Sequence, residues 1–253
     1  MSEKEIQFGP KLAEGKTKVI YAHPDDPALV YMTHKDNLSA GDGARRNVLP
    51  GKGAAACETT SNVFEVLNEA GVATHYVDKV GDVVNVVRRC EMIPLEVVMR
   101  RVATGSYIRR HPEVEEGARF EPALVEFFYK DDAAHDPLVT EEQIVEMGVA
   151  TPVEIEAMRS AGREVFEVLE GKWAEQDVVL VDCKIEFGRT DEGALLVADV
   201  IDNDSWRIWP GGDRSRMLDK QIYREMPEVT DERLADLLRK YLQVAELTSE
   251  WVD

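Results

Sequence analysis

The segment of residues 178–188, Val-Val-Leu-Val-Asp-Cys-Lys-Ile-Glu-Phe-Gly, constrains the fold more than any other part of the chain. In an extended strand, successive side chains point to opposite faces of the sheet. One face of this strand is then wholly apolar, and the other carries three charges in a row, Asp182, Lys184 and Glu186. The pattern predicts an antiparallel sheet that is covered on one side, with a charged face that is either solvated or used for binding.

The remaining elements are predicted from periodicity and from capping residues. A helix is predicted near residues 60–70, with Gly71 as its stop, and another opens at the capping box Thr151-Pro-Val-Glu154. A last helix begins near Asp231. Strands are predicted at residues 17–21, 28–33, 72–78, 83–89, 95–102, 178–187 and 194–201. Because strands come in blocks, the fold class is α+β with mainly antiparallel sheets, not a Rossmann-type sheet.

The chain of 253 residues has a formal net charge of −19. A field this negative repels nucleic acid and anionic membranes, so neither is expected as a partner. It also repels nucleotides, so phosphorylated ligands would need basic residues gathered locally and a cation; alternatively, the charge serves only solubility. The three cysteines form no CxxC pair, and the N-terminus has no export signal, which favours reduced thiols and a cytoplasmic location.

Asp199 lies inside an otherwise apolar run, residues 195–201. An unpaired buried carboxylate is costly, and a magnesium ion that bridges phosphates would explain both Asp199 and Glu186. In a regular antiparallel hairpin, directly opposed residues share a face, and the faces alternate along each strand. Glu186 and Asp199 therefore share a face only if the numbers of each opposed pair add up to an odd value. The sequence leaves that register open.

Two further segments suit phosphate binding. Arg100 ends a predicted strand just before Thr104-Gly-Ser106, and a guanidinium beside a hydroxyl and a glycine forms a phosphate or carboxylate clamp. Lys16 and Lys18 alternate onto one face of a strand that follows Gly15, which suits a lid over phosphates. The spacing is not that of a Walker A loop. An arginine beside a turn and two exposed strand lysines are the plain alternatives.

Three more residues are candidates on weaker patterns. Asp42 is flanked by two glycines, which present its carboxylate from a tight turn, and Arg207 and Arg224 add cations. The chain has no HExxH and no GxSxG motif, so hydrolase chemistry of those kinds has no support.

Five segments in order along the chain resemble the SAICAR synthetase family. The most specific are residues 179–188 and the run Ile-Pro-Leu-Glu-Val-Val-Met-Arg…Thr-Gly-Ser at 93–106. Residues 14–21, 39–45 and 130–137 support them. The resemblance implies a ligase that joins L-aspartate to the carboxylate of carboxyaminoimidazole ribonucleotide, with ATP converted to ADP and phosphate, in purine biosynthesis.

The resemblance also implies a role for each candidate residue. Lys16, Lys18 and Ile20 would contact ATP, Glu186 and Asp199 would hold Mg²⁺, and Lys184 would neutralise charge at the transferred phosphoryl group. The ribonucleotide phosphate would be held by Arg100, Ser106 and Arg207. The rest of the site would be lined by Asp42, Asp136 and Arg224.

The family fold is two-lobed, with nucleotide bound between the lobes. This predicts a β-rich nucleotide-binding lobe at residues 1–92 and an α+β lobe with the metal and ribonucleotide sites at residues 93–253. A homo-oligomer is expected, with a dimer favoured. Two residues depart from the family pattern: Val200, where many relatives have a second carboxylate, and Trp206, where many have a small residue.

Two other classes of function are alternatives to a ligase: a kinase and a nucleotide-binding module without catalysis. A small-molecule or protein kinase would also present lysine and carboxylate groups around Mg·ATP, but the chain has no HRD-type catalytic loop. A nucleotide-binding module that has lost catalysis would have no need for the full set of Arg100, Lys184, Glu186 and Asp199.

Overall fold

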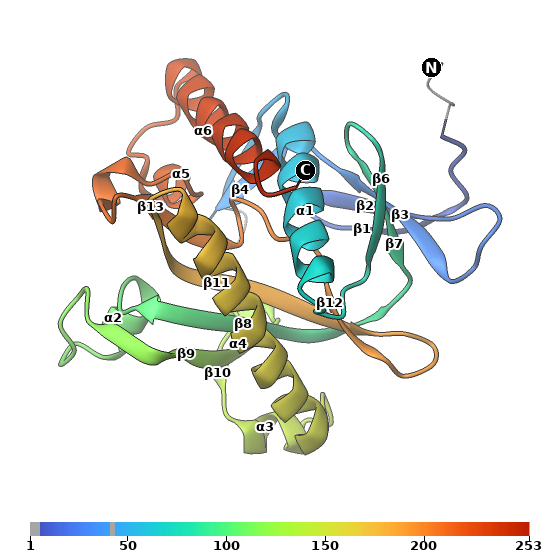
Figure 1. Cartoon of the computed structure of the whole chain (residues 1–253), viewed down its shortest axis with the longest axis horizontal. Helices are drawn as coiled ribbons and strands as arrows, with labels where there is room; N and C mark the ends of the chain where they lie inside the picture. The colour runs from blue at the N-terminus through green and yellow to red at the C-terminus, as the bar shows by residue number, and fades with distance from the viewer. Residues whose placement is uncertain (1–5, 41–43, 253) are drawn as a thin grey trace. The chain divides into compact units, whose positions relative to one another are not determined.

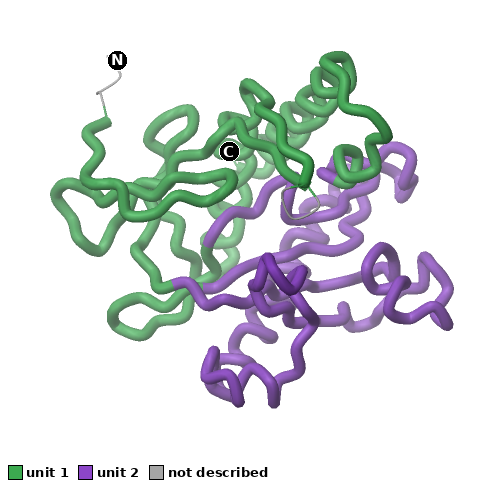
Figure 2. The backbone as a smooth tube through the Cα atoms, turned by 180° about the vertical axis from the view of Figure 1, so that it is seen from behind, with its two compact units in different colours: residues 1–91, 188–198, 221–253 green, residues 92–187, 199–220 purple. Residues whose placement is uncertain are grey.

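The structure is a computed structural model, and it describes residues 6–40 and 44–252. The chain divides into two compact units, shown in green and purple in Figure 2: Met1–Glu91, Gly188–Ala198 and Gln221–Asp253 form the first, and Met92–Phe187 and Asp199–Lys220 form the second. The predicted lobe boundary at residue 92 lies next to the first change of unit. However, residues 188–198 and 221–253, which were predicted in the second lobe, group with the first unit.

The first unit contains an antiparallel sheet of order β1-β2-β3-β7-β6 (Figure 1). Its strands are β1 (Lys11–Glu14), β2 (Lys18–Ala22), β3 (Leu29–His34), β6 (Tyr76–Gly81) and β7 (Val84–Arg88). The predicted strands at 17–21, 28–33 and 83–89 are confirmed, and β6 begins four residues later than predicted. Strand β12 (Leu195–Ala198) joins this unit through a parallel bridge between Thr74 and Val197, which explains why residues from the second predicted lobe belong here.

Helix α1 (Lys52–Glu69) begins eight residues before the predicted start. Its first two turns, Lys-Gly-Ala-Ala-Ala-Cys-Glu-Thr, hold no large apolar side chain, so no hydrophobic period marks them. The N-terminus is capped from a distance, because Asp36 Oδ1 accepts hydrogen bonds from the backbone N–H groups of Gly51 (3.2 Å) and Gly53 (2.8 Å). The predicted stop is confirmed: Gly71 follows the C-cap with φ 89°.

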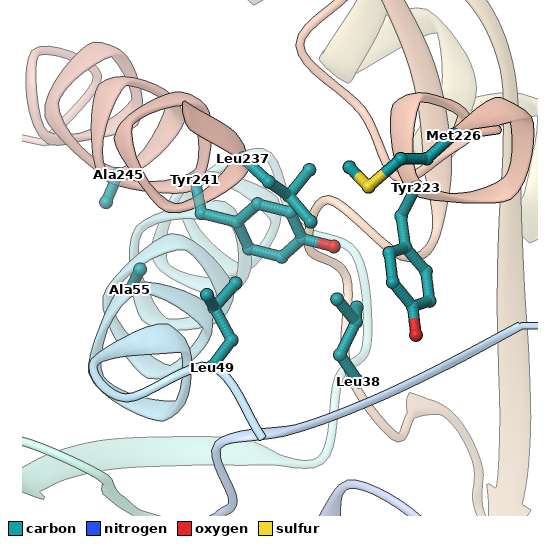
Figure 3. Packing of buried hydrophobic residues seen from close by; sticks show 8 residues of the cluster. All are labelled: Leu38, Leu49, Ala55, Tyr223, Met226, Leu237, Tyr241 and Ala245. Atoms are coloured by element: carbon teal, nitrogen blue, oxygen red, sulfur yellow. The ribbon is translucent and has the colours of Figure 1, made fainter. Parts of the chain in front are cut away.

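Helix α6 (Asp231–Ser249) explains why the C-terminal residues belong to the first unit. Its buried residues Leu237, Tyr241 and Ala245 pack with Ala55 of α1 and with residues from two short segments (Figure 3). These segments are the hairpin β4 (Asn37–Ala40) and β5 (Arg45–Val48), which was not predicted in the glycine-rich stretch, and α5 (Gln221–Glu225). The remaining members of the cluster are Leu38, Leu49, Tyr223 and Met226.

A buried polar network joins α1 to the first unit's sheet. Asn85 of β7, which is fully buried, accepts a hydrogen bond from His34 Nε2 (2.7 Å) and donates to Ser61 Oγ (2.8 Å). Ser61 in turn donates to the carbonyl oxygen of Cys57 (2.8 Å). Each contact satisfies a polar atom that would otherwise be costly to bury.

Asn85→Leu should therefore destabilise the protein by about 2–3 kcal/mol, because it removes the buried hydrogen bonds to His34 and Ser61 while keeping the number of side-chain heavy atoms. Denaturant unfolding measures the effect. Asn37→Leu, at an exposed position of β4, is the control and should change stability by less than about 0.5 kcal/mol. Equal stability of the two variants would show that the network contributes nothing.

The second unit contains strands in the order β10-β9-β8-β11, and β13 pairs with the first half of β11. The strands are β8 (Glu91–Val102), β9 (Arg119–Tyr129), β10 (Leu138–Val139), β11 (Val178–Arg189) and β13 (Trp206–Pro210). The predicted strands within β8 and β11 are confirmed, whereas β9, β10 and β13 were not predicted.

The helices of the second unit are α2 (Ser106–Arg110), α3 (Glu141–Glu146) and α4 (Pro152–Glu175), with short 3-10 turns at Asp132–Ala134 and Arg214–Arg216. The predicted capping box of α4 is confirmed, since Thr151 and Glu154 cap each other's backbone. No described helix combines the length and apolar character that crossing a bilayer requires.

Candidate active site

Strand β11 has the two different faces that its sequence predicts. Val181, Cys183, Ile185 and Phe187 are all at most 1% exposed. Helix α4 lies over this apolar side of the sheet (Figure 1). The approach is close, because a Cβ added at Gly162 of α4 would lie 3.1 Å from Met99 Sδ of β8 and 3.4 Å from Val97 Cγ1.

Trp206 belongs to this apolar side. It is paired with Cys183 across β11 and β13, and its ring meets Trp173 of α4 edge-on at 5.2 Å between centroids. Its neighbour Arg207 pairs with Asp182 and faces the other side. The departure at Trp206 therefore lies in the packing of the core, on the side of the sheet opposite Arg207.

The other face of the sheet carries a chain of alternating charges. Arg100 of β8 donates from Nε to Glu126 Oε2 of β9 (2.6 Å) and from Nη1 to Asp182 Oδ2 of β11 (3.0 Å). The same Asp182 oxygen accepts from Arg207 Nη1 (2.7 Å), and Glu126 also pairs with Arg110 of α2. The guanidinium groups of Arg100, Arg110 and Arg207 outnumber the carboxylates of Glu126 and Asp182 by one, so these five groups form an end of the face with one net positive charge.

The turn after β8 completes this positive end. Ser106 Oγ lies 3.2 Å from Arg100 Nη2. Gly105, at φ 59° and ψ −123°, has a backbone conformation that is open essentially to glycine alone. A Cβ there would lie 2.6–2.9 Å from the guanidinium of Arg207. The structure thus brings Arg100, Ser106 and Arg207 together, as a shared phosphate site requires.

Lys184 marks the opposite end of the face. Its Nζ donates to Glu186 Oε1 (2.8 Å) and Glu96 Oε1 (3.1 Å), and Glu186 Oε2 accepts from Lys130 Nζ (2.5 Å). Burial by itself would lower the pKa of Lys184, but the carboxylates of Glu186, Glu96 and Asp199 outweigh it and raise that pKa. Lys184 therefore stays an ammonium at neutral pH.

Asp199 does not lie in a strand, which corrects the prediction. Strand β12 ends at Ala198, and Asp199 follows it in the left-handed region with φ 67°, half-buried. The open question of hairpin register therefore does not arise. Its carboxylate helps to raise the pKa of Lys184. The carboxylates of Glu96, Glu186 and Asp199 outnumber the ammonium groups of Lys184 and Lys130 by one, so these five groups carry one net negative charge.

The carboxylate donors suit one kind of metal. Among the described residues there is no cluster of three or more histidine, cysteine, aspartate or glutamate side chains placed to hold an ion. Glu186 and Asp199 are two hard oxygen donors beside an excess of negative charge. Such a pair fits Mg²⁺, which usually keeps water and phosphate oxygens as its other ligands.

Asp136 lies in a strained loop of the second unit. His135 and Asp136 both adopt positive φ, 60° and 47°, and Asp136 Oδ1 accepts a hydrogen bond from the backbone N–H of Asp131 (2.8 Å). The loop follows Lys130, so it leads directly from the negative end of the charged face. Consecutive left-handed residues without glycine are costly and often mark functional sites.

The other candidates belong to the first unit. Lys18 and Ile20 lie in β2, but Lys16 lies in the bend before it, so the prediction of two lysines on one strand is wrong. Arg224 is exposed on α5, with Nη1 3.3 Å from Gln221 Oε1. Asp42 lies outside the described residues.

Several residues of the charged face had no predicted role: Glu96, Arg110, Glu126, Lys130 and Asp182. A signal existed for Glu126. In Ala-Leu-Val-Glu-Phe-Phe-Tyr at residues 123–129, it alternates with Val125 and Phe127, which are buried. This alternation predicts a strand with Glu126 on its polar face. The structure adds the pairing, with Glu126 directly across from Val98 of β8 and diagonal to Arg100.

The sequence model of SAICAR synthetase matches residues 11–240 of the chain. The chain belongs to the SAICAR synthetase family. A phosphoribosylaminoimidazole-succinocarboxamide synthase of Roseiflexus castenholzii is 61% identical over 248 residues, which cover 98% of this chain and 100% of that relative. The family therefore extends over nearly the whole chain.

Solved structures support the fold. The synthase of Ehrlichia chaffeensis has a TM-score of 0.85 at 28% identity, covering 95% of this chain and 98% of that one. A SAICAR synthetase in complex with ADP has a TM-score of 0.84 at 31% identity, covering 94% and 97%. The predicted α+β fold with antiparallel sheets is confirmed. The chain is an ATP-using carbon–nitrogen ligase with SAICAR synthetase activity, in purine biosynthesis.

Proposed function

We propose that the charged face of the second unit binds carboxyaminoimidazole ribonucleotide along β11. Its phosphate binds at the positive end, to Arg100, Ser106 and Arg207, and its carboxylate lies at the negative end near Lys184. The observation that carries the proposal is that the face has cations at both ends, Arg100 and Arg207 at one and Lys184 at the other. Each anionic group of the substrate would meet a cation, and a magnesium ion would offset the excess of carboxylates at the Lys184 end. At about 3.3 Å per residue, Lys184 lies about 7 Å along the strand from Asp182, so one ribonucleotide can reach both ends.

The chemistry at the Lys184 end follows from the substrate. A carboxylate is a poor electrophile, so ATP first transfers its γ-phosphoryl group to a carboxylate oxygen and ADP leaves. The amine of L-aspartate then attacks the carbonyl carbon of the acyl phosphate, inorganic phosphate departs with the C–O bond electrons, and the nitrogen releases a proton to solvent. Lys184, a fixed ammonium, stabilises charge on the phosphoryl group as it is transferred, with electrostatics and proximity supplying most of the catalysis.

Magnesium would be held by Glu186 and Asp199. When bound, Mg²⁺ supplies charge neutralisation for the phosphate oxygens of ATP. Lys130 and Lys184 each donate to one oxygen of Glu186, so they fix the orientation of this carboxylate.

The nucleotide and the remaining substrate contacts are proposed from the family resemblance. In the first unit, Lys16 and Lys18 would contact the phosphates of ATP, and Ile20 would also contact the nucleotide. Asp42, Asp136 and Arg224 would line the rest of the site. A homodimer is also proposed, and light scattering tests it.

The purified chain should release ADP only when magnesium, carboxyaminoimidazole ribonucleotide and L-aspartate are all present. A coupled ADP assay that omits one component at a time checks this. ADP release that is equally fast without aspartate would instead indicate a kinase. No release under any condition would indicate a non-catalytic nucleotide-binding protein, and equal use of glutamate would contradict the substrate assignment.

A further inference from the structure

We propose that Asp182 and Glu126 are positioning residues that set the orientation of the phosphate-binding arginines. The inference rests on the proposed function, since it assumes that Arg100 and Arg207 hold the ribonucleotide phosphate. Neither carboxylate would touch the substrate. They act through the arginines.

The guanidinium of Arg100 is held on three sides. Nε donates to Glu126 (2.6 Å), Nη1 donates to Asp182 (3.0 Å), and Nη2 lies 3.2 Å from Ser106 Oγ. Its side chain is 4% exposed and those of both carboxylates are 9% exposed. Because every nitrogen of the planar group has a partner, only one orientation satisfies them all.

The contact with Ser106 has a consequence for ligand binding. A hydroxyl that accepts a hydrogen bond from a guanidinium still has its own O–H to donate. Arg100 Nη1 and Nη2 each have a second N–H as well. The fixed orientation of Arg100 therefore leaves a set of donors on one side of the group, which suits a phosphate with three acceptor oxygens.

Asp182 also brings the second arginine into this arrangement. Its Oδ2 accepts from Arg207 Nη1 at 2.7 Å while it accepts from Arg100, so two like charges converge on one oxygen. Gly105 makes room for Arg207, because any Cβ there would collide with the guanidinium. Without the carboxylate, the two cations would repel each other and separate.

The two roles open to Asp182 predict opposite effects. If it only cancels positive charge, its removal should strengthen the binding of a phosphate dianion. If it positions the arginines, its removal should weaken that binding. In Asp182→Asn, the amide oxygen could still accept from the guanidinium groups, but the negative charge that holds two cations against one oxygen would be gone. The two arginines would then repel each other, so at least one of them should lose its place.

We expect Asp182→Asn to raise KM for carboxyaminoimidazole ribonucleotide by about 10- to 100-fold, the range for a lost hydrogen bond to a charged group. The KM for ATP should not change, and kcat should fall less than twofold, because the phosphate is remote from the bond being made. Steady-state kinetics measure all three. A fall in the ribonucleotide KM, or a loss confined to kcat, would overturn the proposal.

Glu170→Gln is the matched control. Glu170 of α4 accepts from both Nε and Nη2 of Arg101 at 2.7 Å, so the variant breaks an arginine–carboxylate pair on the opposite side of β8. Its ribonucleotide KM should stay unchanged. If Glu170→Gln raised the ribonucleotide KM as much as Asp182→Asn does, the effect would come from general destabilisation of the sheet, and the positioning role would be contradicted.

Two further variants complete the design. If Asp182→Asn does not fold, Glu126→Gln tests the positioning role instead, with the same expected rise in the ribonucleotide KM.

Calorimetry of ribonucleotide binding to Arg100→Lys, Asp182→Asn and Glu126→Gln tests the phosphate site and the positioning role separately. If Arg100→Lys binds normally, the proposed phosphate site is wrong. If Arg100→Lys binds weakly but Asp182→Asn and Glu126→Gln bind normally, the phosphate site stands and the positioning role is wrong.

Discussion

Lys184→Met should lower kcat by about three orders of magnitude, roughly 4 kcal/mol of transition-state stabilisation. Lys184 is already a fixed ammonium between Glu96 and Glu186, so it needs no reorganisation as charge moves onto the transferred phosphoryl group. Methionine keeps the length and the apolar stem but removes the charge. Substrate binding should weaken much less, because the charge on the reacting group grows in the transition state.

Steady-state kinetics with each substrate varied in turn test this expectation, and circular dichroism checks the fold. Lys172→Met, on α4, removes a lysine from another part of the second unit and should leave kcat within twofold. Normal kcat for folded Lys184→Met would remove Lys184 from the chemistry. A large rise in the ribonucleotide KM with unchanged kcat would place it at the binding end instead.

Asp199→Asn should lower turnover by about two orders of magnitude, roughly 3 kcal/mol, at ordinary magnesium concentration. Asp199 sits at φ 67°, and asparagine tolerates the left-handed region as well as aspartate does. The variant therefore keeps the backbone and loses only the charge. Higher magnesium should recover part of the activity.

Two measurements make this result specific to the metal. The apparent magnesium requirement should rise in Asp199→Asn, and Mn²⁺ binding in the presence of ADP, followed by electron paramagnetic resonance, should weaken in parallel. A folded variant with near-normal turnover and unchanged metal binding would show that Asp199 serves only the structure.

Alternation and capping made part of the second unit predictable. The charges of Asp182, Lys184 and Glu186 recur every second residue along a strand, and this period alone determines which face each one occupies. Thr151 and Glu154 likewise mark the start of α4 by local hydrogen bonds. Such features depend on residues close in sequence, so the sequence shows them directly.

The partners of those charges were not predictable in the same way. Arg100 meets Asp182 across 82 positions of sequence, and Lys130 meets Glu186 across 56, so both contacts depend on strand order. Asp199 was placed in a strand because its neighbours are apolar, but β12 ends just before it. Trp206 was noted only as a departure from the family pattern, and the alternation along β13 puts it and Arg207 on opposite faces.

The most direct test of the account is a crystal structure of this protein with Mg·ADP and carboxyaminoimidazole ribonucleotide. We expect the ribonucleotide's phosphate within hydrogen-bonding distance of Arg100, Ser106 and Arg207, and its carboxylate next to Lys184, with magnesium on Glu186 and Asp199. A phosphate beside Lys184 and a carboxylate beside Arg100, or a ribonucleotide bound away from this face, would contradict it.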